Sequence, residues 1–232
     1  MSSCHAVLVT AAGSSRRFNE SCDSASQLKK EFLTIGGQQI LSMSIRPFLQ
    51  VPGTGVLAVT YRDGDLDAVK GIVDGLSDLT DDVEVLFVKG GLTRQESVFN
   101  GLKKLADISK NQPEIVLVHD GARPWVTENI IQDVIKKATI YGASVPAIPA
   151  VDTQKIVDES GKITHHLKRK YVYAVQTPQA FEFNRLLEAH TKACNDNTEY
   201  TDDTEIWAAY CGDVYISEGN IINKKITFQS DL

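Results

Sequence analysis

A stretch of small residues that ends in two arginines is the first chemical signal in this sequence: it reads Ala11-Ala12-Gly13-Ser14-Ser15-Arg16-Arg17. Small residues let the backbone approach a phosphate group closely, with its N–H groups directed at the oxygens. Guanidinium groups match pairs of phosphate oxygens. The stretch has neither the Gly-Lys-Ser/Thr of a Walker A loop nor the G-x-G-x-x-G of a dinucleotide-binding loop. The two arginines favour a triphosphate-binding loop over a plain turn between a strand and a helix.

Two further stretches carry residues suited to nucleotide binding. One is the charged cluster Lys29-Lys30-Glu31, which on its own is typical of a solvated surface. The other is Lys89-Gly90-Gly91-Leu92-Thr93-Arg94-Gln95-Glu96-Ser97. Its glycines allow close approach of a base or a ribose, whereas capping of a helix by Thr93 is the structural alternative. From the residues alone, both interpretations stay open for each stretch.

An aspartate follows the apolar run 115–118, in the motif His119-Asp120-Gly121-Ala122-Arg123-Pro124. A carboxylate at a buried strand end is costly unless it is paired with a cation. Arg123 could be that cation, which would make a purely structural ion pair. Binding of a Mg²⁺ ion that bridges phosphates is the functional alternative.

Other polar candidates lie farther along the chain. Thr201-Asp202-Asp203 opens a helix, where the two carboxylates could simply cap its positive end. The segment 176–181, Gln-Thr-Pro-Gln-Ala-Phe, is interpreted as the end of a strand. The remaining candidates are Asp152 and Thr153, Arg169, and the adjacent lysines Lys224 and Lys225.

The elements that must position these residues follow from apolar periodicity. Short β-branched runs predict strands at 6–10, 56–61, 83–88, 115–118, 143–148, 172–175 and 214–217. Between them, apolar residues at three- and four-residue spacing predict helices across 41–49, 66–76, 98–105 and 130–135. This alternation predicts an α/β fold with a mostly parallel, Rossmann-like twisted sheet and helices on both faces. Ligands of such sheets bind at the carboxyl ends of the strands, where the candidate residues lie.

Two segments interrupt the alternation. Residues 19–28 are small and polar and predict a mobile loop. Residues about 150–170 contain two short strand-like pieces around Ser160-Gly161, which predicts a projecting β-hairpin arm. Such a hairpin is marginal alone and is usually packed on something. We expect a single domain over 1–232 that carries this arm.

Composition limits the function further. Hydrophobic residues make up 42% and charged residues 23% of the 232 residues, as in a folded soluble protein. The apolar runs are too short to span a bilayer and no signal peptide is recognisable, so we expect a cytoplasmic protein with no membrane partner. The net charge of −6 argues against general nucleic-acid binding, although a local basic cluster can still bind a small anion. The four scattered cysteines form no C-x-x-C pair and are interpreted as free thiols.

Taken in order, these segments carry a family signature. The set is Ala-Ala-Gly-x-x-x-Arg, Lys-x-Phe-Leu, Gly-Gly-x-x-Arg-x-x-Ser, His-Asp-x-Ala-Arg-Pro, Asp-Thr, Thr-Pro-Gln, Thr-Asp-Asp and Lys-Ile-Thr. With it, nearly all of 1–232 resembles the 2-C-methyl-D-erythritol 4-phosphate cytidylyltransferase family. The resemblance implies a nucleotidyltransferase-type fold and transfer of CMP from CTP to 2-C-methyl-D-erythritol 4-phosphate. The products would be 4-diphosphocytidyl-2-C-methyl-D-erythritol and pyrophosphate, in the non-mevalonate route to isoprenoid precursors.

The resemblance also implies roles for residues at matching positions. The catalytic cations would be Arg17, Lys30 and Lys225, with the first two stabilising charge on the α-phosphate. CTP would be held by Ala11, Ala12, Gly13, Gly91, Ser97, Asp120 and Ala122, with Mg²⁺ on its phosphates and Asp120 as the metal ligand. The sugar-alcohol phosphate would be held by Thr153, Arg169, Thr177, Thr201 and Lys225. In this family the arm reaches across a homodimer, so Thr153 and Arg169 would serve the neighbouring subunit's site.

Several alternatives stay open from the sequence. Ribitol-5-phosphate cytidylyltransferases share the Gln-Thr-Pro-Gln segment, and a non-catalytic nucleotide sensor could use the same fold. Either Lys224 or Lys225 could be the functional lysine, and Glu31 stands where the family commonly has glutamine. The chain could also be trimmed, or be the front half of a bifunctional protein.

Overall fold

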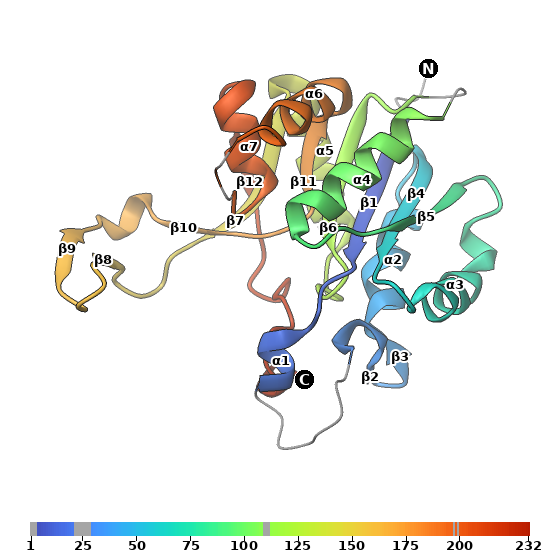
Figure 1. Ribbon diagram of the computed structural model, residues 1–232, viewed down its shortest axis with the longest axis horizontal. Helices are drawn as coiled ribbons and strands as arrows, with labels where there is room; N and C mark the ends of the chain where they lie inside the picture. The colour runs from blue at the N-terminus through green and yellow to red at the C-terminus, as the bar shows by residue number, and fades with distance from the viewer. Residues whose placement is uncertain (1–3, 21–28, 109–111, 197, 199) are drawn as a thin grey trace.

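The computed structural model describes residues 4–20, 29–108, 112–196, 198 and 200–232, and its centre is an eight-stranded sheet (Figure 1). Four neighbouring strands run parallel in the order β5-β4-β1-β6. Their bounds are Glu84–Lys89, Thr54–Tyr61, His5–Ala11 and Ile115–Asp120. Beyond β6 lies the antiparallel β11 (Gln179–Glu182), then β7 (Ala143–Pro149), with β10 (Tyr173–Val175) antiparallel and β12 (Tyr215–Glu218) parallel to β7. The predicted mostly parallel sheet is confirmed.

Helices cover both faces of this sheet because strand side chains alternate between the two sides. Val7 and Val9 of β1 face a core formed with α2 (Ile40–Gln50), α3 (Leu66–Asp74) and α5 (Glu128–Tyr141). Ala6 and Leu8 face the opposite core, formed with α4 (Arg94–Ala106), α6 (Phe183–Ala193) and α7 (Asp203–Tyr210). In the described part of the chain, no helix is both long and apolar enough to cross a membrane.

Several short elements complete the chain. They are α1 (Arg16–Glu20), η1 (Lys30–Phe32), β2 (Thr34–Ile35), β3 (Gln38–Gln39), η2 (Ser77–Leu79), η3 (Arg169–Tyr171) and η4 (Gln229–Asp231). The loop expected at 19–28 begins as the last residues of α1, and 21–28 lie outside the described residues. The β2–β3 pair was not predicted, because two-residue strands show no periodicity.

One strand prediction is wrong. Segment 176–181 was interpreted as the end of a strand, whereas Gln179 begins β11 between β6 and β7. β10 and β11 pair with successive stretches of β7, and the ladder is interrupted at 176–178. At the interruption the Asp120 N–H donates to the Thr177 hydroxyl at 3.1 Å, so a side chain replaces a backbone partner. A polar, proline-containing segment hides such a continuation from pattern analysis.

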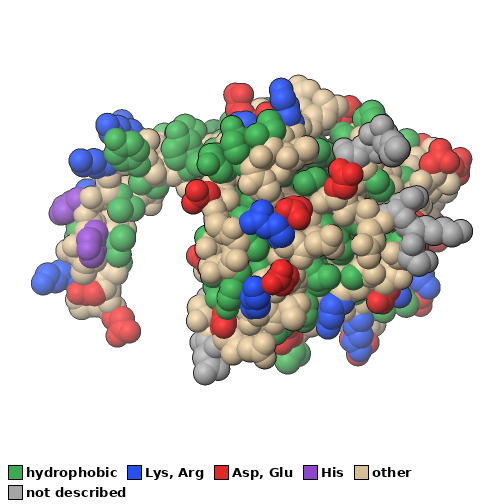
Figure 2. Space-filling view, turned by 90° about the horizontal axis from the view of Figure 1, so that it is seen from above, with side chains coloured by type: hydrophobic (Ala, Val, Ile, Leu, Met, Phe, Trp, Pro, Cys, Tyr) green, Lys and Arg blue, Asp and Glu red, His purple; other side chains and the backbone are tan. Residues whose placement is uncertain are grey.

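The predicted hairpin arm is present. It consists of β8 (Lys155–Val157) and β9 (Ile163–His166), which pair antiparallel. The Asp158 carboxylate accepts hydrogen bonds from the backbone N–H groups of Ser160 and Lys162 and so closes the turn. Every residue from 151 to 171 is exposed, and Figure 2 shows the arm standing clear of the body. Within the described residues, the hairpin of β8 and β9 therefore buries no side chain against the body of its own chain.

A buried histidine at the start of β1 makes stability depend on pH. Burial lowers the pKa of His5 from its ordinary 6.5 to about 4. The Nε2 atom lies 2.8 Å from the Thr54 hydroxyl, whose own proton goes to the Phe48 carbonyl at 2.7 Å, so Nε2–H is the donor. Between these two pKa values the unfolded chain binds a proton that the folded chain does not, and stability falls as the pH falls.

We predict that His5→Gln, which can keep the donor to Thr54, loses less stability than the wild type between pH 6.5 and about 4. The difference should reach up to about 3 kcal/mol. Urea unfolding at several pH values measures it. Equal slopes of unfolding free energy against pH in the two proteins would contradict the assignment.

Candidate active site

The loops that follow β1 and β5 lie against one another at the carboxyl end of the sheet. A Cβ atom at Gly90 would collide with the Cβ of Ala12 and lie 2.9 Å from the Ser97 hydroxyl oxygen, so only glycine permits this approach. The Gly91 N–H donates to the Ser97 hydroxyl at 3.1 Å. Thr93 caps α4, as the structural alternative predicted, by accepting from the Glu96 N–H at 3.1 Å. Capping and close approach therefore coexist. They bring the end of β1 and the loop after it, with Ala11, Ala12 and Gly13, close to Gly91 and to Ser97 in the first turn of α4.

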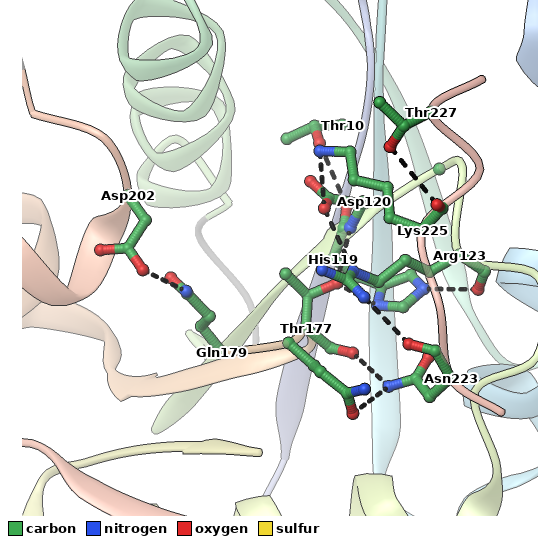
Figure 3. A network of polar contacts seen from close by, with 12 residues as sticks. Thr10, His119, Asp120, Arg123, Thr177, Gln179, Asp202, Asn223, Lys225 and Thr227 are labelled. Atoms are coloured by element: carbon green, nitrogen blue, oxygen red, sulfur yellow. Dashed lines mark hydrogen bonds and ion pairs between the residues drawn. The ribbon is translucent and has the colours of Figure 1, made fainter. Parts of the chain in front are cut away.

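Asp120, at the end of β6, is the centre of a cluster of charges (Figure 3). Its side chain is 8% exposed. Its Oδ2 lies 2.9 Å from Lys225 Nζ and 3.3 Å from Arg123 Nε, and Oδ1 lies 3.9 Å from Arg94 Nε. Burial disfavours the charged form, but the three cations outweigh it and hold the pKa of Asp120 well below its usual range. The ion pair between Asp120 and Arg123 that the sequence suggested is therefore present, and it is one of three ion pairs that Asp120 makes within the described residues.

The geometry separates the two adjacent lysines. Lys225 faces Asp120, whereas Lys224 Nζ lies 5.3 Å from the centre of the Trp125 ring in a cation–π contact. The segment is fixed by the Ile226 N–H, which donates to the Ala122 carbonyl at 2.9 Å. Lys225 is thus the lysine that contacts Asp120, and the Ala122 carbonyl holds the segment that carries it.

Lys30 enters the same region from η1. Its ammonium is buried and donates to the Ile226 carbonyl at 2.7 Å. Burial, with Lys225 and Arg17 nearby, lowers the pKa of Lys30, while Glu31 and Asp120 oppose the change. Arg17, on α1, is exposed and close enough to act on Lys30 electrostatically.

The interpretation of Lys29 and Lys30 as solvated surface charge is wrong. The Lys29 side chain is 9% exposed and donates to the Gly13 carbonyl at 2.7 Å, which ties η1 to the loop after β1. The Ser15 hydroxyl accepts from the Lys30 N–H at 3.3 Å and donates to the Glu31 carboxylate at 3.2 Å. Glu31 therefore positions the small-residue loop.

A buried ion-pair network next to Asp120 was missed in the sequence. Arg94 Nη2 lies 2.8 Å from Asp203 Oδ2, and His190 Nε2 lies 3.1 Å from the other oxygen of this fully buried carboxylate. Asp202 does cap α7, but Asp203 is paired rather than a cap. Burial opposes ionisation of Asp203, yet Arg94 and His190 keep its pKa lowered. The one sequence signal for this network was the position of Arg94, which begins α4 shortly after Gly90 and Gly91.

The acceptor residues expected from the sequence lie in three places. Thr177 lies in the Asp120 cluster, where its hydroxyl accepts from the Asp120 N–H. Thr201 is exposed immediately before α7, and its N–H donates to the Glu205 carboxylate at 2.8 Å. Thr153 and Arg169 belong to the exposed arm, where Arg169 Nη1 donates to the Val151 carbonyl at 3.2 Å. Figure 1 shows the arm directed away from the body of its own chain.

The donor set limits which metal could bind here. Within the described ranges no cluster of three or more His, Cys, Asp or Glu side chains could hold a metal ion. Asp120 is a lone carboxylate, with Oδ2 already taken by two cations. Mg²⁺ commonly binds through one or two carboxylates together with substrate phosphates and water. These residues fit a Mg²⁺ ion that arrives with phosphates rather than a resident metal.

The fold and this cationic site together define an α/β nucleotidyltransferase. Residues 5–232 match the family model for 2-C-methyl-D-erythritol 4-phosphate cytidylyltransferase, and the chain belongs to that family. A Clostridium novyi protein of that name is 37% identical over 97% of this chain and 92% of its own length. A bifunctional IspD/IspF enzyme of Bradyrhizobium is 38% identical over 87% of this chain and 49% of its length. The crystal structure of the Anaerococcus prevotii 4-diphosphocytidyl-2C-methyl-D-erythritol synthase superposes with a TM-score of 0.82 at 27% identity, covering 99% of this chain and 93% of that one.

The two lysines offer a matched pair of variants. We predict that Lys225→Met lowers kcat by about 10²–10³, because it removes a preorganised cation beside Asp120. Lys224→Met loses an exposed cation–π contact worth about 0.5–1 kcal/mol and should keep near-normal kcat. Steady-state pyrophosphate release measures both. A larger loss from Lys224→Met than from Lys225→Met would reverse the assignment.

Proposed function

We propose that this chain transfers CMP from CTP to 2-C-methyl-D-erythritol 4-phosphate, releasing pyrophosphate. The proposal rests on membership of the family and on one observation, the convergence of cations around Asp120. The whole chain carries a net charge of −6, yet at this site the cations outnumber the carboxylates. A local excess of positive charge suits two anionic substrates. In this proposal the reaction takes place in the cytoplasm.

The chemistry needs positioning and cations rather than a nucleophilic side chain. An oxygen of the acceptor phosphate forms a bond to the α-phosphorus of CTP, and the bond from that phosphorus to the bridging oxygen of the leaving pyrophosphate breaks. Arg17 and Lys30 neutralise charge that builds up on the α-phosphate oxygens, and Lys225 holds the acceptor phosphate. Lys30 is suited to this role because a buried ammonium acts through a low local dielectric. The backbone of 11–13 and Gly91 approaches the nucleotide.

Magnesium enters this proposal with the nucleotide. When bound, the ion neutralises phosphate charge and orients the triphosphate. Asp120 would be the protein ligand in this proposal, because it is the carboxylate at the centre of the cation cluster. Lys225 and Arg123 on Oδ2, with Arg94 at 3.9 Å from Oδ1, would hold this carboxylate in place.

We predict pyrophosphate release with CTP and 2-C-methyl-D-erythritol 4-phosphate that stops in excess chelator and returns with Mg²⁺. ATP, GTP and UTP, each offered with the same acceptor, should give much lower rates. Ribitol 5-phosphate offered with CTP tests the related acceptor. Comparable rates with all nucleotides, full activity in chelator, or preference for ribitol 5-phosphate would each contradict the proposal.

We also propose a homodimer in which the arm of one subunit completes the site of the other. Residues 151–171 are all exposed within one chain, including apolar side chains at Val151, Ile156 and Val157. A thin hairpin of this kind is unstable without a partner surface. Thr153 and Arg169 sit on this arm, which Figure 1 shows directed away from the body of its own chain. A closed twofold dimer would bury two arms and create two equivalent composite sites.

Complementation tests the shared site. Lys30→Ala and Arg169→Ala, each nearly inactive alone, are unfolded together and refolded. Random pairing makes about half of the dimers mixed, and one site in each mixed dimer carries neither change, so about a quarter of wild-type activity should return. Refolding each variant alone is the control. No recovery, with dimers confirmed by sedimentation, would show that Arg169 serves its own subunit.

A further inference from the structure

His119 is a buried residue of the site to which the transfer reaction assigns no role. It is fully buried at the end of β6, with its ring centre 4.8 Å from that of Phe48. Its Nδ1 lies 3.0 Å from the Thr177 hydroxyl oxygen, and its Nε2 lies 3.2 Å from the Arg123 carbonyl oxygen. Both ring nitrogens are therefore engaged, one with Thr177 and one with the backbone of the residue that pairs with Asp120 (Figure 3).

The partners of the ring fix where each proton lies. The Arg123 carbonyl can only accept, so Nε2 carries the proton of the neutral ring. Nδ1 is then a bare acceptor, and the proton between it and Thr177 belongs to the hydroxyl. The same hydroxyl oxygen already accepts from the Asp120 N–H at 3.1 Å. The Thr177 hydroxyl has a single proton, and it donates this proton to Nδ1 of His119.

We propose that His119 is a positioning residue that orients the Thr177 hydroxyl, so that Thr177 meets the acceptor substrate through an oxygen lone pair and not as a proton donor. A phosphate oxygen, which only accepts, would find no proton there, whereas a hydroxyl group of the polyol could donate to Thr177. His119 would thereby help to direct the polyol end of the acceptor toward Thr177. The role in turnover rests on the proposed function, whereas the arrangement of protons does not.

Two variants separate the two ring nitrogens. His119→Asn can place an amide oxygen near the position of Nδ1 and keep an acceptor for Thr177. His119→Gln places its amide near Nε2, where it can donate to the Arg123 carbonyl, but it leaves the Thr177 hydroxyl without its acceptor. We expect His119→Gln to lower kcat/KM for the acceptor by about 10- to 100-fold, with a smaller change in KM for CTP. His119→Asn should recover most of that loss. Equal losses in both, with both folded by circular dichroism, would overturn the proposal.

A double-mutant cycle tests whether His119 acts through Thr177. In the Thr177→Val background, His119→Gln should lower kcat/KM by less than about threefold further, because the hydroxyl that it orients is already gone. Losses that multiply would show that His119 supports the site by another route, and would overturn the positioning role. Thr177→Ser, which keeps the hydroxyl, is the control.

A measurement that needs no activity covers the case in which the variants do not fold. Nitrogen-15 NMR of the wild-type protein with labelled histidine reports the tautomer of each ring, and the ring of His119 is assigned by through-bond correlation in the wild type. The Nε2–H form supports the proposal, and the Nδ1–H form overturns it. If the wild type releases no pyrophosphate from CTP and 2-C-methyl-D-erythritol 4-phosphate, the proposed function fails while the tautomer result still stands.

Discussion

The buried carboxylate of Asp120 is the constraint to which the rest of the site is fitted. A charge at this depth is tolerated only when cations and donors surround it, and removing one partner leaves the charge uncompensated. Arg94, Arg123 and Lys225 come from three separate parts of the chain, and each is drawn toward the same two oxygens. The end of β6 therefore fixes the start of α4, the turn after β6 and the C-terminal segment relative to one another.

A small apolar cluster fixes the backbone on which cations of the site lie. Phe18, Ile40 and Ile226 are fully buried together, and Leu33, Ile35 and Trp125 pack against them. Phe18 is the neighbour of Arg17, and Ile226 is the neighbour of Lys225, so burial of the apolar residues dictates where the charged ones emerge. The carbonyl of Ile226 also receives the Lys30 ammonium. The packing of this apolar cluster thus determines where the charged side chains of the site lie.

Much of this arrangement could be predicted from sequence, and the failures have physical reasons. Regular apolar periods in β1, α4 and α5 specify buried faces, so the parallel strands and the helices α2 to α5 were predicted, whereas α6 was not. β11 was not, because its preceding Thr177-Pro178 interrupts the ladder. The choice between Lys224 and Lys225 depends on an aromatic ring and a carboxylate more than 90 residues away. Arg94 and Asp203 likewise come together only in the folded chain, so no local sequence pattern could predict their ion pair.

The hydrogen bond from Lys30 to Ile226 joins residues 196 positions apart, and this has a consequence for biosynthesis. A ribosome adds about 5–20 residues per second, so roughly 10 to 40 s pass between synthesis of the two partners. The strands β1, β4, β5 and β6 can assemble in that interval, whereas the cationic cluster cannot. A nascent chain would therefore hold a folded sheet with Asp120 supported by Arg94 and Arg123 alone, and substrate binding would begin only once the last segment has docked.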